Sequence, residues 1–370
     1  MPYRPKDIYK GRRKYRVGLA IGLSVLGVLL LGSIGLFYFL QQFIVYDQSG
    51  VTLELPSQRT EETSAAQATP EPTFEPVTVQ IIYENTDFSQ IDLGGWDTLT
   101  ETRTRLVPFA DATDSAKLAA AVSDAETSGL TGLVLELKTT EGQLAWSSES
   151  ELAVNYGTAG STDYTETITA LHEAGLTAGA QICCCADELM ATRNWTVALC
   201  GADGTVYRDE EDICWLDPYN RSVRTYLQEL VGELAAMGFD EVILTGLYHP
   251  VSEAGFQYSV AVQTDPDPVT AICQLGRRLV NAAGDTGCAV SVMLDRDSLL
   301  EGTGSATGQD VSTFWRLFAR LYCPCTEGDA NTVRSTALQT MNGGNADIRF
   351  VPVLSSASEG TASYCIDAKS

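Results

Sequence analysis

Three stretches of the chain share one order of elements: an amphipathic helical pattern, a glycine, and then a continuous apolar run. The pattern predicts helices over residues 114–128, 164–174 and 221–237, which end at Gly129, Gly175 and Gly238. A glycine at the end of a helix supplies the left-handed backbone that a C-cap needs. Repeated helix–glycine–strand units indicate parallel strands joined by right-handed crossovers.

Continuous apolar runs are typical of strands that are buried on both faces. Residues 77–370 are close in number to the roughly 250 of a (β/α)8 barrel, which is the fold that we predict. An open doubly wound sheet is the alternative, although no Gly-x-Gly-x-x-Gly follows a strand, which disfavours a dinucleotide site. The eight predicted strands are 105–110, 132–138, 176–182, 241–247, 288–294, 321–325, 348–354 and 362–366.

The N-terminal region contains an uncharged apolar segment from Val17 to Leu40. A helix of that length would span about 36 Å, enough to cross a bilayer, whereas the apolar part of a signal peptide has only about 7–15 residues. We therefore predict a transmembrane signal anchor over residues 17–43, with a buried core helix as the alternative. Seven basic residues precede it, so residues 1–16 are expected to be a cytoplasmic tail of a single-pass protein in the cell membrane.

Charge is divided unevenly between the two sides of this segment. The whole chain has a net charge of −24, and the part after residue 46 is more acidic still. Such a domain is not expected to bind nucleic acid, because that binding depends on basic side chains. Residues 47–76 are rich in Ser, Thr, Glu and Pro, which predicts a disordered linker between the membrane and an extracytoplasmic domain.

All ten cysteines lie in the predicted external domain. Several fall inside predicted strands, including Cys183–Cys185 and Cys288, where a reduced thiol acts as a small apolar side chain. Cys323-Pro-Cys325 is the possible exception. The chain has two histidines and no Cys-x-x-Cys, so neither a metal site nor a cofactor is expected.

The working residues of a (β/α)8 barrel lie at the C-terminal ends of its strands. Glycoside hydrolysis needs two carboxylates about 5–9.5 Å apart, which makes Glu136 with Asp187 or Asp295 the candidate catalytic pair. The candidate substrate-binding residues near the same strand ends are Lys138, Trp215, Asp217, Thr245, Tyr248 and His249.

Several candidates also have a structural interpretation. Glu136 and Lys138 could neutralise each other inside the barrel, as buried charges must. Asp187 could be a solvated loop acid, Asp217 a turn residue before a proline, and Trp215 a core residue. Asp240-Glu241 begins its strand, on the face of a barrel that contributes stability, and is therefore assigned a structural role.

Four segments together resemble a bacterial family of glycosyl-hydrolase-like domains, which are (β/α)8 barrels distantly similar to the α-amylase group. They are Leu-Glu-Leu-Lys (135–138) with Glu141-Gly142, Leu-His-Glu-Ala-Gly (171–175), Trp-Leu-Asp-Pro-Tyr (215–219) and Met-Gly-Phe-Asp-Glu-Val-Ile (237–243). Gly308-Gln309-Asp310 and Ile348–Pro352 fit more weakly. The resemblance covers residues 104–356 and implies a carbohydrate ligand.

The chain departs from the family at the fourth and fifth strands. Thr245 stands where the resemblance implies the fourth-strand Asp, which is the expected nucleophile, and Tyr248 stands where it implies an Arg. Met293 occupies the position of the fifth-strand Asp, and Glu136 matches the second-strand acid. Three hypotheses follow: a catalytically degenerate barrel that binds cell-envelope glycan, an active glycosidase with a relocated carboxylate pair, and a non-catalytic envelope scaffold.

Overall fold

A computed structural model describes residues 44–47, 50–53, 98–258, 267–326, 328–339, 345–357 and 362–367. The chain divides into two compact units, Met1–Gln80 and Ile81–Ser370. In the first, β1 (Ile44–Asp47) pairs antiparallel with β2 (Gly50–Leu53). The predicted tail, the predicted membrane anchor and most of the predicted linker lie outside the described residues. Among the residues that are described, no helix has the length and apolar character to cross a membrane.

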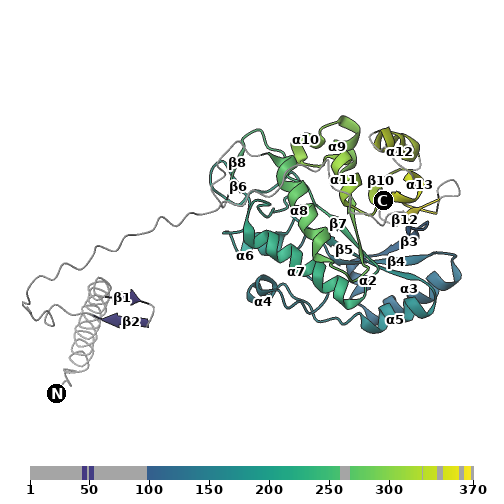
Figure 1. The fold of residues 1–370 in the computed structure, drawn as a ribbon, viewed down its shortest axis with the longest axis horizontal. Coiled ribbons are helices and arrows are strands. Elements are labelled where there is room, and N and C mark those ends of the chain that lie inside the picture. The colour runs from purple at the N-terminus through teal and green to yellow at the C-terminus, as the bar shows by residue number, and fades with distance from the viewer. Residues whose placement is uncertain are drawn as a thin grey trace, which may run out of the picture. The chain divides into compact units, whose positions relative to one another are not determined.

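The second unit is built on a closed parallel barrel (Figure 1). Each barrel strand pairs with the next barrel strand along the chain, and the last pairs with the first, with Ile366 opposite Arg105. This closure confirms the predicted barrel and excludes the open sheet. The eight strands are β3 (Arg103–Val107), β4 (Gly132–Lys138), β5 (Thr177–Cys183), β7 (Glu241–Thr245), β9 (Ala289–Met293), β10 (Leu321–Pro324), β11 (Phe350–Leu354) and β12 (Tyr364–Ile366).

Helices connect the strands and cover the outside of the barrel (Figure 1). The three predicted helices are confirmed as α3 (Ser115–Thr127), α5 (Thr165–Glu173) and α7 (Arg221–Met237). Gly129, Gly175 and Gly238 follow them with φ of 68°, 72° and 104°, the left-handed conformation that their positions predict. The other helices are α2 (Phe109–Ala112), α4 (Glu151–Tyr156), α6 (Glu188–Arg193), α8 (Pro268–Ala282), α9 (Arg296–Glu301), α10 (Gly304–Thr307), α11 (Val311–Leu317), α12 (Ala330–Gln339) and α13 (Ala346–Arg349).

Two predicted strands are longer than the observed ones because short helices replace their ends. The first strand stops at Val107, because Pro108 is the N-cap of α2. The strand predicted to start at residue 348 starts at Phe350, because α13 occupies the residues before it.

Side chains alternate between the barrel interior and the surrounding helices. On β4, Leu133, Leu135 and Leu137 belong to the core beneath the helices, whereas Val134 packs in the interior with residues such as Ile243 and Tyr322. Glu136 lies two residues beyond Val134 and so extends the inward-facing row toward the C-terminal end of the strand.

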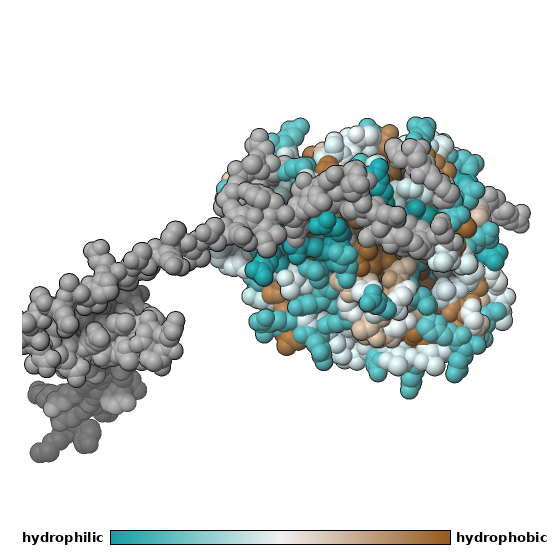
Figure 2. Space-filling view, viewed as in Figure 1, coloured by the Kyte–Doolittle hydropathy of each residue, from teal (hydrophilic) through white to brown (hydrophobic). Residues whose placement is uncertain are grey.

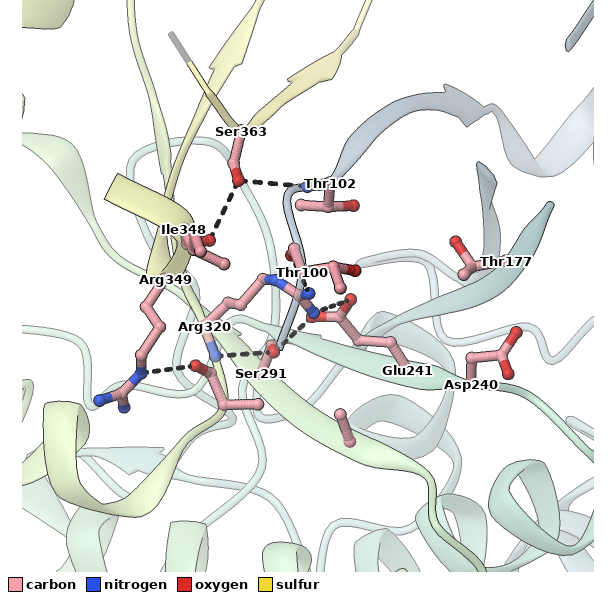
Figure 3. A network of polar contacts seen from close by, with 12 residues as sticks. Thr100, Thr102, Thr177, Asp240, Glu241, Ser291, Arg320, Ile348, Arg349 and Ser363 are labelled. Carbon is pink, nitrogen blue, oxygen red and sulfur yellow. Dashed lines mark hydrogen bonds and ion pairs between the residues drawn. The ribbon is translucent and has the colours of Figure 1, made fainter. Parts of the chain in front are cut away.

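A charged network closes the N-terminal end of the barrel (Figure 3). The Arg320 guanidinium lies 2.9 Å from the Glu241 carboxylate, and it also donates to the Thr100 carbonyl. Ser291 donates to Glu241 and accepts from the Arg320 backbone amide. Burial alone would lower the pKa of Arg320, but the Glu241 charge raises that pKa above its ordinary value. The structural role that the sequence indicates for Glu241 is confirmed.

Arg320→Met would leave the Glu241 carboxylate buried without its counter-charge. We expect the free energy of unfolding to fall by about 3–5 kcal/mol, measured by urea denaturation with tryptophan fluorescence. Arg221→Met, at an exposed position, is the control and should change it by less than about 0.5 kcal/mol. Equal effects of the two substitutions would show that the buried pair contributes no stability.

Candidate active site

Glu136 is the carboxylate that β4 presents inside the C-terminal end of the barrel. It is only partly buried, and its Oε2 accepts a hydrogen bond of 3.0 Å from the backbone amide of Phe109. Gln181 on β5 lies beside it in the strand register. The other carboxylate carried by a barrel strand is Glu241, which belongs to the network at the opposite end.

The structural interpretation in which Lys138 neutralises Glu136 is wrong. A break in the register between β4 and β5 separates the two residues, and Lys138 pairs instead with Asp187. Its Nζ lies 2.9 Å from Asp187 Oδ2 and donates to the Cys183 carbonyl at 2.6 Å. Both charged side chains are 0% exposed. Burial alone would lower the pKa of Lys138, but the Asp187 charge raises it above its usual value.

Both carboxylate oxygens of Asp187 therefore contact groups of the protein. One of its oxygens contacts Lys138, and the other accepts from the backbone amide of Met190, which caps α6. Gly142 is needed beside it, because a Cβ on this residue would lie 1.9 Å from Asp187 Oδ1. A carboxylate without solvent-accessible surface cannot reach a sugar, so neither a solvated acid nor a catalytic partner for Glu136 is found at this position.

The loops that follow β5 and β7 meet in a small lobe. There β6 (Cys200–Gly201) pairs antiparallel with β8 (Phe256–Gln257), at the margin of the domain away from β12 (Figure 1). Trp215 is 2% exposed, donates to Asp209, and packs against Tyr248 with ring centroids 4.9 Å apart. The predicted stacking residue Trp215 is thus a core residue of the lobe.

His249 and Asp217 are also buried within this lobe. His249 Nδ1 lies 2.7 Å from the Pro250 carbonyl, so Nδ1 carries the proton and Nε2 accepts from the Tyr258 hydroxyl at 3.3 Å. The ring packs edge-on against Phe256. Burial lowers the pKa of His249. Asp217 accepts from the backbone amide of Tyr219, as a turn residue does.

Two further candidates remain partly exposed at the strand ends. Thr245 donates a long hydrogen bond of 3.4 Å to the Ile182 carbonyl. Asp295 is the N-cap of α9 and lines a cavity of about 420 Å³ that Glu136 does not line. This cavity does not bring Glu136 and Asp295 together.

Gln309 organises this edge of the barrel, and sequence reasoning gave it no role. Its side-chain amide donates to the carbonyls of Leu247 and Met293, and its oxygen accepts from the Asp295 amide at 2.7 Å. It thereby joins the segments that follow β7 and β9. The weakly matching triplet Gly308-Gln309-Asp310 was the one sequence signal for it.

Residues 106–294 match a family model described as "Putative glycosyl hydrolase domain". The chain belongs to this family. No curated protein matches the sequence.

The chain is also similar to solved structures at low sequence identity, and the first of those below has the same fold. The glycoside hydrolase domain of PgaB (BpsB) from Bordetella bronchiseptica matches with a TM-score of 0.53 and 12% identity, over 72% of this chain and 94% of that one. A hypothetical protein from Ruminiclostridium thermocellum matches with a TM-score of 0.44 and 19% identity, over 51% of this chain and 96% of that one. Aspergillus fumigatus Ega3, in complex with galactosamine, matches with a TM-score of 0.42 and 9% identity, over 75% and 96%.

The buried His249 predicts a pH dependence of stability. Because its folded-state pKa lies below its unfolded value of about 6.5, the unfolded chain binds more protons there, and stability falls as the pH drops below about 6.5. We expect the unfolding free energy of the wild type to decrease more between pH 7.5 and pH 5 than that of His249→Gln, measured by urea denaturation at each pH. Parallel pH profiles for the two proteins would contradict this assignment.

Proposed function

We propose that the domain is a membrane-anchored, extracytoplasmic barrel that binds a cell-envelope glycan at its C-terminal end without hydrolysing it. The observation that carries the proposal is that, within the described residues, the acid expected to act with Glu136 on the neighbouring strand is buried in an ion pair. Asp187 is neutralised by Lys138, and Thr245 and Met293 occupy the positions at which the family resemblance implies acids. Glycosidases of the usual kind need a second carboxyl group as nucleophile or base.

The groups at this end of the barrel suit recognition of a neutral sugar. The Glu136 carboxylate can accept from a sugar hydroxyl, and the side chains of Thr245 and Gln181 can donate or accept. The Phe109 amide holds Glu136 in place. A site with these groups can orient a glycan without supplying the second group that bond cleavage requires.

The exposed surface also favours a sugar over a broad protein contact. Trp195, which follows α6, is 71% exposed, and an exposed indole provides a face on which a sugar ring can stack. On the face seen in Figure 2, hydrophobic residues lie in small groups between hydrophilic ones. A scaffold partner is expected to need a larger contiguous apolar patch.

The binding proposal predicts a specific role for Glu136. The full chain in detergent should release no reducing ends from α- and β-glucans, peptidoglycan fragments or exopolysaccharides, and should bind one of these polymers saturably. Glu136→Gln should raise the Kd for that polymer about 10-fold, the effect of losing a hydrogen bond to a charged group. Glu173→Gln, at an exposed site on α5, is the matched control and should leave the Kd unchanged.

Other outcomes of the same assay distinguish the alternatives. Reducing-end release that Glu136→Gln abolishes would identify an active glycosidase with a relocated carboxylate pair. If the chain neither releases reducing ends nor binds any of these polymers, the hypothesis of a non-catalytic envelope scaffold is favoured instead.

The anchor proposal rests on the uncharged segment Val17–Leu40. Placing two arginines at its centre, as Leu29→Arg with Leu30→Arg, should oppose insertion by roughly 2.5–3.5 kcal/mol per residue. We expect the wild-type chain in the membrane fraction after carbonate extraction and the double variant in the soluble fraction. Leu29→Ile with Leu30→Ile is the control and should remain with the membrane. Recovery of the wild type in the soluble fraction would overturn the anchor.

A further inference from the structure

The cavity that Asp295 lines contains no residue of the eight barrel strands in its described wall. It has a volume of about 420 Å³ and is lined by residues that follow β9 and by residues of α8, α9, α11 and α12. Figure 1 shows α9, α10, α11 and α12 grouped on one side of the barrel. Small-molecule sites span roughly 300–1,000 Å³, so this cavity suits a ligand of one or two sugar units in size.

Two aspartates on the cavity wall each keep one oxygen uncommitted. Asp295 Oδ2 accepts from the Ser298 amide and thereby caps α9, and Asp310 Oδ2 accepts from Thr313 and caps α11. Among the described residues, no hydrogen bond or ion pair reaches Oδ1 of either aspartate. In each carboxylate, one oxygen therefore caps a helix and the other is available to a ligand.

Ser298 provides an independent indication of a ligand. Its residue surface is only 6% exposed, it lines the cavity, and its hydroxyl has no hydrogen-bond partner within the described residues. Since the residue is almost fully buried and its hydroxyl has no partner in the described protein, the hydroxyl is expected to contact water or a ligand in the cavity.

The charge of the lining selects the ligand class. Asp295 and Asp310 are its charged groups in the described part of the chain, and no basic side chain lines the cavity there. The nearby Arg296 is engaged by Asp297 and Asp329. An anion would be repelled, whereas a protonated amine would gain charge-assisted hydrogen bonds.

We propose that this cavity binds a small hydroxylated amine, such as an amino sugar. The ammonium group contacts the free oxygens of Asp295 and Asp310 and the Ser298 hydroxyl. Thr336 and Gln339 are placed to bond the ligand's hydroxyls, and Leu294 and Leu299 to pack against its carbon frame. The site is separate from Glu136, and the proposal stands whether or not the barrel mouth binds a polymer.

Titration calorimetry of the full chain with glucosamine, glucose and N-acetylglucosamine tests the proposal. Glucosamine should bind at least 10-fold more tightly than the other two sugars, which lack the positive charge. Asp295→Asn and Asp310→Asn should each weaken glucosamine binding about 10-fold. Asparagine is as good an N-cap as aspartate, so both variants should keep the wild-type melting temperature.

Matched controls separate the cavity from general charge effects. Asp114→Asn makes the same change at the N-cap of α3, whose residues do not line this cavity, and should leave glucosamine binding unchanged. Glu173→Gln, at an exposed site on α5, should also leave it unchanged, and polymer binding is measured in its own assay, so failure of the polymer-binding proposal is distinguishable from failure of this one. Ser298→Ala should weaken binding by a smaller factor than either aspartate variant.

Three results would overturn the proposal. The first is equal affinity for glucosamine and glucose. The second is an equal loss of binding in Asp114→Asn and Asp310→Asn. The third is calcium binding that both cavity variants abolish while glucosamine gives no heat, which would identify a cation site instead.

Discussion

The buried Lys138–Asp187 pair is the constraint on which the C-terminal end of the barrel depends. A lysine and an aspartate with no solvent exposure are tolerated because each neutralises the charge of the other. The pair joins β4 to the start of α6, and its lysine also holds the end of β5 through the Cys183 carbonyl. Gly142 has no side chain where that carboxylate needs room. An acid that would otherwise be available for chemistry is thereby committed to the fold, and Glu136 is left without this partner.

The two ends of the barrel handle charge in opposite ways. At the N-terminal end, Arg320, Glu241 and Ser291 form a closed network that fills the opening of the barrel. At the C-terminal end, Glu136 stays partly exposed with one backbone donor. The network at the N-terminal end stabilises the barrel, so polar groups at the C-terminal end can stay without protein partners. Such groups are available to bind a ligand there.

The sequence could predict the fold because the local signals agree with one another. Glycines such as Gly238 mark helix ends, and the apolar runs mark all eight strands. The partner of Lys138 was predicted wrongly, because a strict alternation places Glu136 and Lys138 on the same side. The change of register between them breaks that alternation, and such an irregularity depends on the neighbouring strand. The burial of Trp215 and His249 could not be decided from the sequence for a related reason, because the lobe that buries them forms from two loops far apart in the chain.

The number of acids near the strand ends does not predict a carboxylate pair, because several of these aspartates are N-caps of short helices. Asp187, Asp295 and Asp310 are all N-caps, and their sequence contexts look alike. They differ in what contacts the second oxygen, which is Lys138 for Asp187 and no described residue for the other two. The tertiary structure alone decides whether a capping aspartate is also available to a ligand. Glu136 at the barrel mouth, and Asp295 and Asp310 in the cavity beside β9, each keep a carboxylate oxygen that no described residue contacts.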